Sequence, residues 1–221
     1  PRPRPEPGER RPAGLPDLLR SPSLRWGMAG IACAGMALFG AGAWIPSVMQ
    51  REHGWSAGET GVAVGAVTAI AGLAGTWTSG WLAERRRSAG DEAAEYAVPM
   101  MAMACVLPPI GLAALDLAPV AVLAAYGLAS FFLLGWNAPS VAAFQLAARD
   151  HNRALAAALH VFLVNLVGLG LGPLAIGALS DRIGDLSTAL SLVVGAAAAF
   201  GTLAFLQAAR ALRKEAEGAP D

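Results

Sequence analysis

Six long stretches of this sequence carry no charged side chain, and they limit the folds open to it more than any other feature. Each stretch contains at least 19 residues without Asp, Glu, Lys or Arg. A bilayer core about 30 Å thick is crossed by roughly 20 apolar residues in an α-helix. Hydrocarbon offers no water to the backbone N–H and C=O groups, so each stretch must be helical. The predicted fold is all-α, a polytopic membrane protein with six transmembrane helices. The stretches are residues 26–49, 61–83, 97–115, 118–147, 154–179 and 186–209.

The basic residues are distributed asymmetrically around these stretches. If the N-terminus is placed in the cytoplasm, fourteen of the sixteen Lys and Arg residues fall on the cytoplasmic side, and Arg51 and Arg182 fall outside. Basic residues that flank transmembrane helices are enriched on the cytoplasmic side. We therefore expect an integral protein of the plasma (inner) membrane with both termini in the cytoplasm.

The segments outside the bundle differ from it in composition. Residues 1–25 are rich in Pro and Arg, which predicts a disordered cytoplasmic linker ahead of the six-helix bundle at 26–209. Residues 210–221 form a short cytoplasmic tail. A chain that opens on a linker resembles the second part of a longer polypeptide. The alternative is a six-helix protein that homodimerises or pairs with another chain, with a transport or scaffold role.

Polar side chains within the stretches are unevenly placed, since the third and sixth stretches contain no Trp, Asn or His. We expect the other four helices to line a path for a small-molecule substrate. His160 is a functional candidate because an ionisable group is costly to bury in hydrocarbon. The alternative is a structural role, in which a neutral imidazole donates a hydrogen bond to a nearby carbonyl. Trp44 and Trp77 could instead be interfacial anchors, whereas Trp136 lies mid-span and is the better candidate for a cavity. The substrate-path candidates are Trp44, Trp77, Trp136, Asn137, His160 and Asn165.

Small residues recur at the spacing that lets membrane helices approach closely. Gly61 and Gly65 form one such pair, and Gly168 and Gly172, followed by Pro173, form another. We expect these residues to mediate helix packing. The same faces could slide over one another in a conformational cycle.

Catalytic chemistry and nucleic-acid binding are both disfavoured. Sixteen basic residues balance sixteen acidic residues, which argues against a nucleic-acid partner. The sequence contains neither an H-E-x-x-H zinc motif nor a Gly-x-x-x-x-Gly-Lys phosphate loop, and Ser130 lacks the Gly-x-Ser context of an intramembrane protease. Cys33 and Cys105 both lie in uncharged stretches. The sequence therefore predicts no enzyme, no metal site and no cofactor.

One loop resembles a signature of a known transporter family. Gly80-Trp81-Leu82-Ala83-Glu84-Arg85 is similar to the G-x-L-A-D-R-x cytoplasmic loop of the major facilitator superfamily (MFS), in its second-half copy. The end of the fifth stretch, Gly177-Ala178-Leu179-Ser180-Asp181-Arg182, is also facilitator-like. Two further stretches resemble bacterial members of the Spinster-like branch, namely 42–56 and 153–173.

The resemblance covers about residues 25–212 and implies the C-terminal six-helix half of a twelve-helix secondary active transporter. It implies alternating access, with a small organic or lipid-like amphipathic solute moved between two six-helix halves. The expected partners are membrane lipid and an N-terminal six-helix half, on the same or a separate polypeptide. The resemblance also implies a gating-loop motif at Gly80, Glu84 and Arg85, with Glu84 where Asp is usual.

Overall fold

A computed structural model describes residues 19–112, 115, 117–147 and 153–217 of the chain. The described residues form helices and no strand, and six spans are long and apolar enough to cross a membrane. The predicted all-α six-helix fold is therefore confirmed. The helices are α2 (Pro22–Arg51), α3 (Ala57–Ser88), α4 (Ala94–Leu112), α5 (Pro119–Gly135), α6 (Asn137–Ala147), α7 (Arg153–Leu163), the π-helical η2 (Val164–Leu171), α8 (Gly172–Ile183) and α9 (Leu186–Glu217).

The first and last helices of the bundle continue past the uncharged stretches, toward the two ends of the chain. α2 begins at Pro22, inside the segment expected to be a linker, because the Ser21 hydroxyl caps the Leu24 N–H and proline is favourable in the first turn. α9 continues to Glu217, inside the predicted tail. Residues 1–18 of the predicted linker lie outside the described part of the chain.

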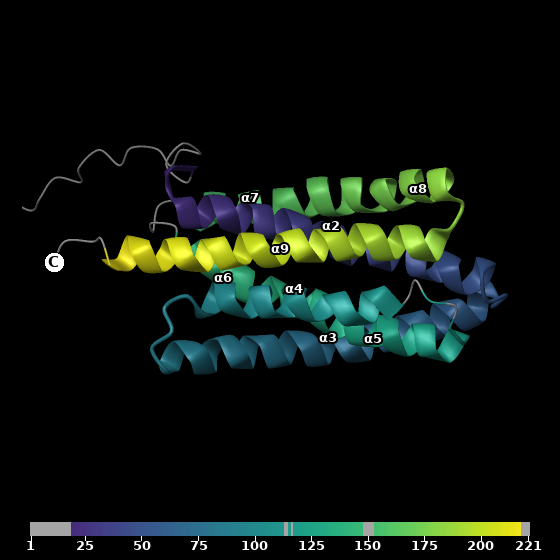
Figure 1. The fold of residues 1–221 in the computed structure, drawn as a ribbon. Helices are drawn as coiled ribbons and strands as arrows, with labels where there is room; N and C mark the ends of the chain where they lie inside the picture. Colours follow the sequence, from purple (N-terminus) through teal and green to yellow (C-terminus); the bar gives the residue numbers. More distant parts are fainter. Residues whose placement is uncertain (1–18, 113–114, 116, 148–152, 218–221) are drawn as a thin grey trace, which may run out of the picture.

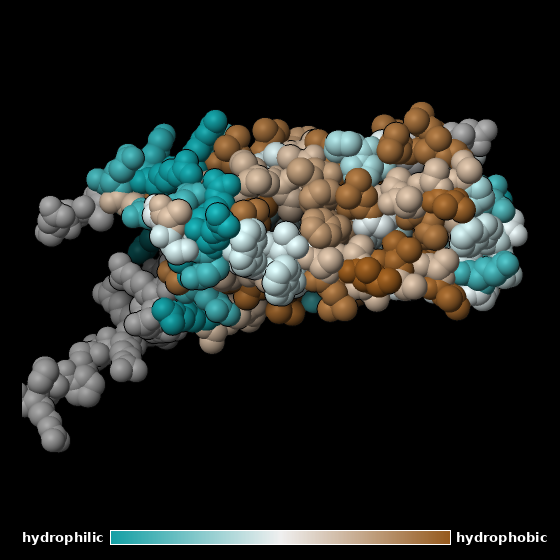
Figure 2. All heavy atoms as spheres, turned by 90° about the horizontal axis from the view of Figure 1, so that it is seen from below, coloured by the Kyte–Doolittle hydropathy of each residue, from teal (hydrophilic) through white to brown (hydrophobic). Residues whose placement is uncertain are grey.

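All the spans run roughly parallel or antiparallel to one long axis (Figure 1). α2 packs against α9, α4 against α9, α3 against α5, and η2 against α2. The start of α2 and the end of α9 lie at the same end of the bundle (Figure 1). We call this the terminal end, and the end that carries the α2–α3 and α8–α9 connections the opposite end. Figure 2 shows an apolar band between more hydrophilic ends, the surface that a membrane-spanning bundle requires.

Two carboxylates join α2 and α9 at opposite ends of this pair. Near the end of α9, Glu215 accepts hydrogen bonds from the Ser21 and Ser23 hydroxyls and from the Ser23 N–H (N···O 3.1 Å) at the start of α2. Just after α2, Glu52 accepts from the N–H and hydroxyl of Ser187 at the start of α9. A carboxylate is unfavourable at the C-terminus of its own helix and favourable at the N-terminus of an antiparallel neighbour. Each helix of the pair is therefore stabilised by an acidic side chain from the other.

Glycines set the closest approaches between the helices. A Cβ on Gly168 would lie 2.8 Å from the backbone of Gly35, and one on Gly172 would lie 2.6 Å from the carbonyl oxygen of Met36, so both glycines mediate packing of the fifth span on α2. Gly61 and Gly65 make no such contact among the described residues, because a Cβ at either would meet no described atom within 4 Å, and their role in helix packing stays a prediction.

On α3 the close contacts come from other glycines further along the helix. A Cβ on Gly75 would lie 1.9 Å from the carbonyl oxygen of Phe131, and one on Gly72 would meet the side chain of Leu134. The contact between α3 and α5 is therefore made beyond Gly61 and Gly65, toward the middle of α3.

Candidate functional site

A buried aromatic and polar cluster lies where the fourth span breaks. Pro139 has no N–H to donate to the carbonyl of Gly135 four residues earlier, and α5 gives way to α6 at Trp136. Trp136 is fully buried and its ring centroid lies 6.2 Å from that of His160, which is 4% exposed. The Phe144 ring packs edge-on against the imidazole, with 6.1 Å between the ring centroids. The structure thus brings two of the predicted site residues, Trp136 and His160, into one cluster.

The hydrogen bonds assign a proton to one nitrogen of His160. The Ser140 hydroxyl donates to the carbonyl oxygen of Asn137 (2.8 Å), so its oxygen can only accept from the imidazole. The Nε2 atom of His160 lies 3.3 Å from that oxygen and must be the donor. The imidazole therefore bonds to a hydroxyl, whereas the alternative predicted from the sequence was a bond to a carbonyl. The Nε1–H of Trp136 is buried without a partner among the described residues.

Trp44 has a structural contact between the first and fifth spans. Its Nε1–H donates to the carbonyl oxygen of Pro173 (2.8 Å), and its ring packs against Gly177. The side chain is only half-buried, so its ring spans the contact between α2 and α8 and remains partly open.

Trp77 and Asn165 lie on exposed faces of two different helices. Trp77 on α3 is 74% exposed. Asn165 on η2 is exposed, and its side-chain amide donates to the carbonyl of Val161 (2.8 Å), where the backbone pattern changes from α to π. Single π-helical segments in membrane and soluble helices are frequent at functional sites. The six candidates therefore form two groups. Trp136 and His160 are buried together, with Asn137 half-buried beside Trp136. Trp44, Trp77 and Asn165 are more exposed and lie outside this cluster.

The predicted gating-loop residues lie near the C-terminus of α3, at the terminal end of the bundle. The Arg85 guanidinium carbon lies 5.2 Å from the centroid of the Trp81 ring, a cation–π contact. The Glu84 side chain is exposed, and a Cβ on Gly80 would meet no described atom within 4 Å. None of these three residues packs tightly within the described bundle, so their surroundings are open.

Asp91 holds the terminal end together, and the sequence reasoning missed it. Its carboxylate bonds to Arg86 (3.0 Å) and to Arg213 of α9 (3.1 Å), and it accepts from the Ala93 N–H. Burial alone would raise the pKa of Asp91, but the hydrogen bonds from Arg213, Arg86 and Ala93 outweigh it and hold the pKa below the ordinary value. The sequence signal for the role of Asp91 was an acidic residue directly after a glycine. In the structure Gly90 has a φ of 90° and turns the chain back from α3 toward α4.

Replacing Asp91 with Asn is expected to lower the free energy of unfolding by about 1 kcal/mol at pH 7. Because the pKa of the folded form is depressed, this stabilisation is fully present above the ordinary carboxyl pKa of about 4 and disappears as the pH falls through the folded value. Melting temperatures of wild type and variant in detergent should therefore differ at pH 7 and converge in acid. The exposed neighbour Glu92→Gln should match wild type at pH 7. A difference that grows in acid would contradict the assignment.

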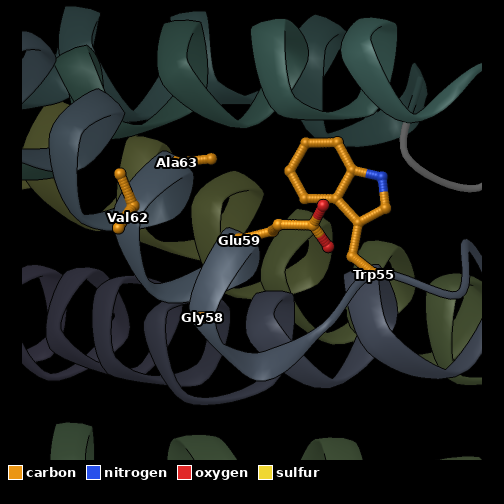
Figure 3. Close-up of a pocket in the computed structure, with 5 residues that line it drawn as sticks. All are labelled: Trp55, Gly58, Glu59, Val62 and Ala63. Atoms are coloured by element: carbon orange, nitrogen blue, oxygen red, sulfur yellow. The ribbon is translucent and has the colours of Figure 1, made fainter.

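Two hollows open on the surface of the described residues. One, at the opposite end, is lined by Trp55, Gly58, Glu59, Val62 and Ala63 (Figure 3). The other lies between α4, α6 and α9 and includes Glu92 and Glu95. Within the described ranges, no three His, Cys, Asp or Glu side chains lie close enough together to hold a metal ion.

Two spans leave wide apolar faces uncovered. In the most apolar window of α3 and of the fifth span, 22% of the residues are buried, against 44–56% in the other four spans. Exposed large side chains follow one face of each: Val62, Ile70, Leu73, Trp77 and Trp81 on α3, and Val161, Phe162, Leu166, Leu169 and Leu174 on the fifth span.

Comparison with known proteins assigns the family. A sequence model of the Major Facilitator Superfamily matches residues 1–173. The chain is 30% identical over 207 residues to an "MFS-type efflux pump" of Mycolicibacterium smegmatis. This alignment covers 90% of the chain but 47% of the relative, so the chain spans about half the length of that protein. With six apolar spans and a family match over most of its length, the chain is an integral membrane protein that belongs to the major facilitator superfamily of transporters.

Proposed function

We propose that the chain is the C-terminal half of a secondary active transporter that moves a small organic or lipid-like amphipathic solute by alternating access. The observation that carries this proposal is the pair of uncovered apolar faces on α3 and the fifth span. Facilitator halves rock against each other around a site near the membrane midplane, and each half must offer the other a face. The second and fifth spans of this bundle offer such faces.

The missing partner in this proposal is an N-terminal six-helix half. It belongs to the same polypeptide or to a separate one, and the double length of the efflux-pump relative favours the first arrangement. A second copy of this chain is the alternative. The relative's name supports export as the direction, and the Spinster-like resemblance supports a lipid-like solute.

The orientation forms part of the same proposal. Arg20, Arg85, Arg86 and Arg213 all lie at the terminal end, which we assign to the cytoplasmic side of the plasma (inner) membrane. The loop motif of Gly80, Glu84 and Arg85 would then face the cytoplasm. Because its side chains are open within this half, they are available to contact the other half in one gate state.

The substrate path is proposed to include Trp44, Trp77 and Asn165, with Asn137, Trp136 and His160 supporting it from within the bundle. A cysteine at position 165 in the full-length protein, with Cys33 and Cys105 changed to Ala, tests this without knowledge of the solute. Because only the thiolate reacts and hydrocarbon suppresses it, a membrane-impermeant maleimide should label Asn165→Cys at least about tenfold faster than a lipid-facing position.

The matched control is Leu203→Cys, since Leu203 is 56% exposed on the sixth span, which we expect to face lipid. Equal labelling at positions 165 and 203 in membrane vesicles would refute a water-filled path at Asn165. An immunoblot with an antibody to the C-terminal tail would give the length of the native polypeptide. A product near 22.5 kDa would favour the separate-chain or homodimer arrangement.

A further inference from the structure

The hollow at the opposite end combines an aromatic wall with a carboxylate. It is an open hollow on the surface, with a volume of about 490 Å³. Figure 3 shows the Glu59 carboxylate directed toward the indole ring of Trp55, with Val62 and Ala63 further along α3. The walls are therefore mainly apolar, with one negative charge beside a large π-face.

The carboxylate of the hollow is held in place before any ligand arrives. The Glu59 carboxylate accepts from the N–H (2.9 Å) and hydroxyl (2.7 Å) of Ser56, in the capping box that begins α3. The backbone N–H of Trp55 donates to the carbonyl oxygen of Met49 (3.2 Å), which holds the chain at Trp55 against the end of α2, and the Trp55 side chain is half-buried against the core. Groups fixed in this way lose little conformational entropy on binding.

The charge of this end favours a cation. Four acidic residues lie at or next to the connections here, Glu52, Glu59, Asp181 and Asp185, against two basic ones, Arg51 and Arg182. Summed charge of one sign raises the local concentration of ligands of the opposite sign. A bare metal ion would find a single carboxylate in the hollow and too few ligands, whereas an anion would meet Glu59 directly.

We propose that this hollow binds a hydrophobic organic cation, with its charge between the Glu59 carboxylate and the Trp55 π-face and its apolar body against Val62 and Ala63. The attraction of a cation to an indole face adds to that of the carboxylate. The site goes beyond the proposed path, because it lies at the end of the bundle and its occupancy requires no transport.

Two ions of the same shape and opposite charge test the proposal. Tetraphenylphosphonium and tetraphenylborate are titrated by equilibrium dialysis against the full-length protein in lipid nanodiscs, with empty nanodiscs as the blank. Glu59→Gln should weaken tetraphenylphosphonium binding about fivefold, and Trp55→Leu by a similar factor. Tetraphenylborate binding should not weaken in Glu59→Gln. Glu217→Gln, which removes an exposed carboxylate at the end of α9 and so at the terminal end of the bundle, should leave both ions unaffected.

The variants preserve the fold by design. Gln completes a capping box as Glu does, so Glu59→Gln should melt at the wild-type temperature.

Ala63→Phe fills the hollow without changing charge and should abolish tetraphenylphosphonium binding above the blank. Unchanged phosphonium affinity in both Glu59→Gln and Ala63→Phe would overturn the proposal. An equal loss of both ions in Glu59→Gln would also overturn it, since recognition would then be apolar. Neither readout depends on transport, so a failure here leaves the proposed function standing.

Discussion

Replacing Gly75 with alanine is expected to disrupt the packing of α3 against α5, whereas the same change at Gly65 leaves the protein intact. A Cβ added at Gly75 would lie 1.9 Å from the carbonyl oxygen of Phe131 and 2.8 Å from its carbonyl carbon. Because both are backbone atoms, no side-chain rotation relieves the overlap, and the two helices must separate. Overpacking usually costs about 1–3 kcal/mol, and a backbone overlap this deep should exceed about 3 kcal/mol.

Gly65 is a matched control for this prediction. It lies on the same helix, both changes add one methyl group, and its Cβ would meet no described atom within 4 Å. Alanine is also the better helix former, so Gly65→Ala should be neutral or slightly stabilising unless the partner half covers it. Size-exclusion profiles and melting temperatures in detergent give the comparison. A Gly75→Ala protein that is monodisperse and melts like wild type would show that α3 and α5 are not packed as described.

The lengths of the uncharged stretches predicted the spans well, because a charged side chain is costly anywhere along a helix that crosses hydrocarbon. The capping box of Ser56 and Glu59 is equally local, since it depends on residues three apart and not on tertiary contacts. The break at Trp136 was missed because both α5 and α6 are apolar and a count of uncharged residues runs straight through. Pro139 was the local signal for it.

The candidate site was harder to predict, because spacing places residues on a helix but not against a neighbour. Gly61 and Gly65 have the same spacing as Gly168 and Gly172, yet only the second pair meets another backbone. The rotation of each helix decides this, and rotation follows from packing over the whole bundle. For the same reason Trp77 and Trp136, both tryptophans within uncharged stretches, end at 74% and 0% exposure.

The long-range carboxylate contacts had no sequence signal. Glu52 and Glu215 each stand at the C-terminal end of a helix, where local rules disfavour them. Only the antiparallel contact of α2 with α9 places them at the N-terminus of the neighbouring helix. Such residues can be explained once the helices are paired, and not before.

Replacing Trp136 with alanine is expected to lower the free energy of unfolding by about 3–5 kcal/mol, the cost of emptying a large buried site. The indole is among the largest fully buried side chains, and the His160 ring packs beside it. A void there would leave the junction of α5 and α6 without its main apolar contact. The variant should form little folded protein in detergent.

Trp136→Phe separates the two roles that the indole could have. Its Nε1–H has no partner among the described residues, so phenylalanine removes a buried donor without breaking a hydrogen bond and should cost much less than alanine. If the indole only packs, Trp136→Phe should retain both the wild-type melting temperature and wild-type transport in the full-length protein. If Trp136→Phe stays folded but loses transport, the unpaired N–H is a functional donor for the solute or a bound water. A loss of stability as large as that of Trp136→Ala would contradict the packing described for the ring.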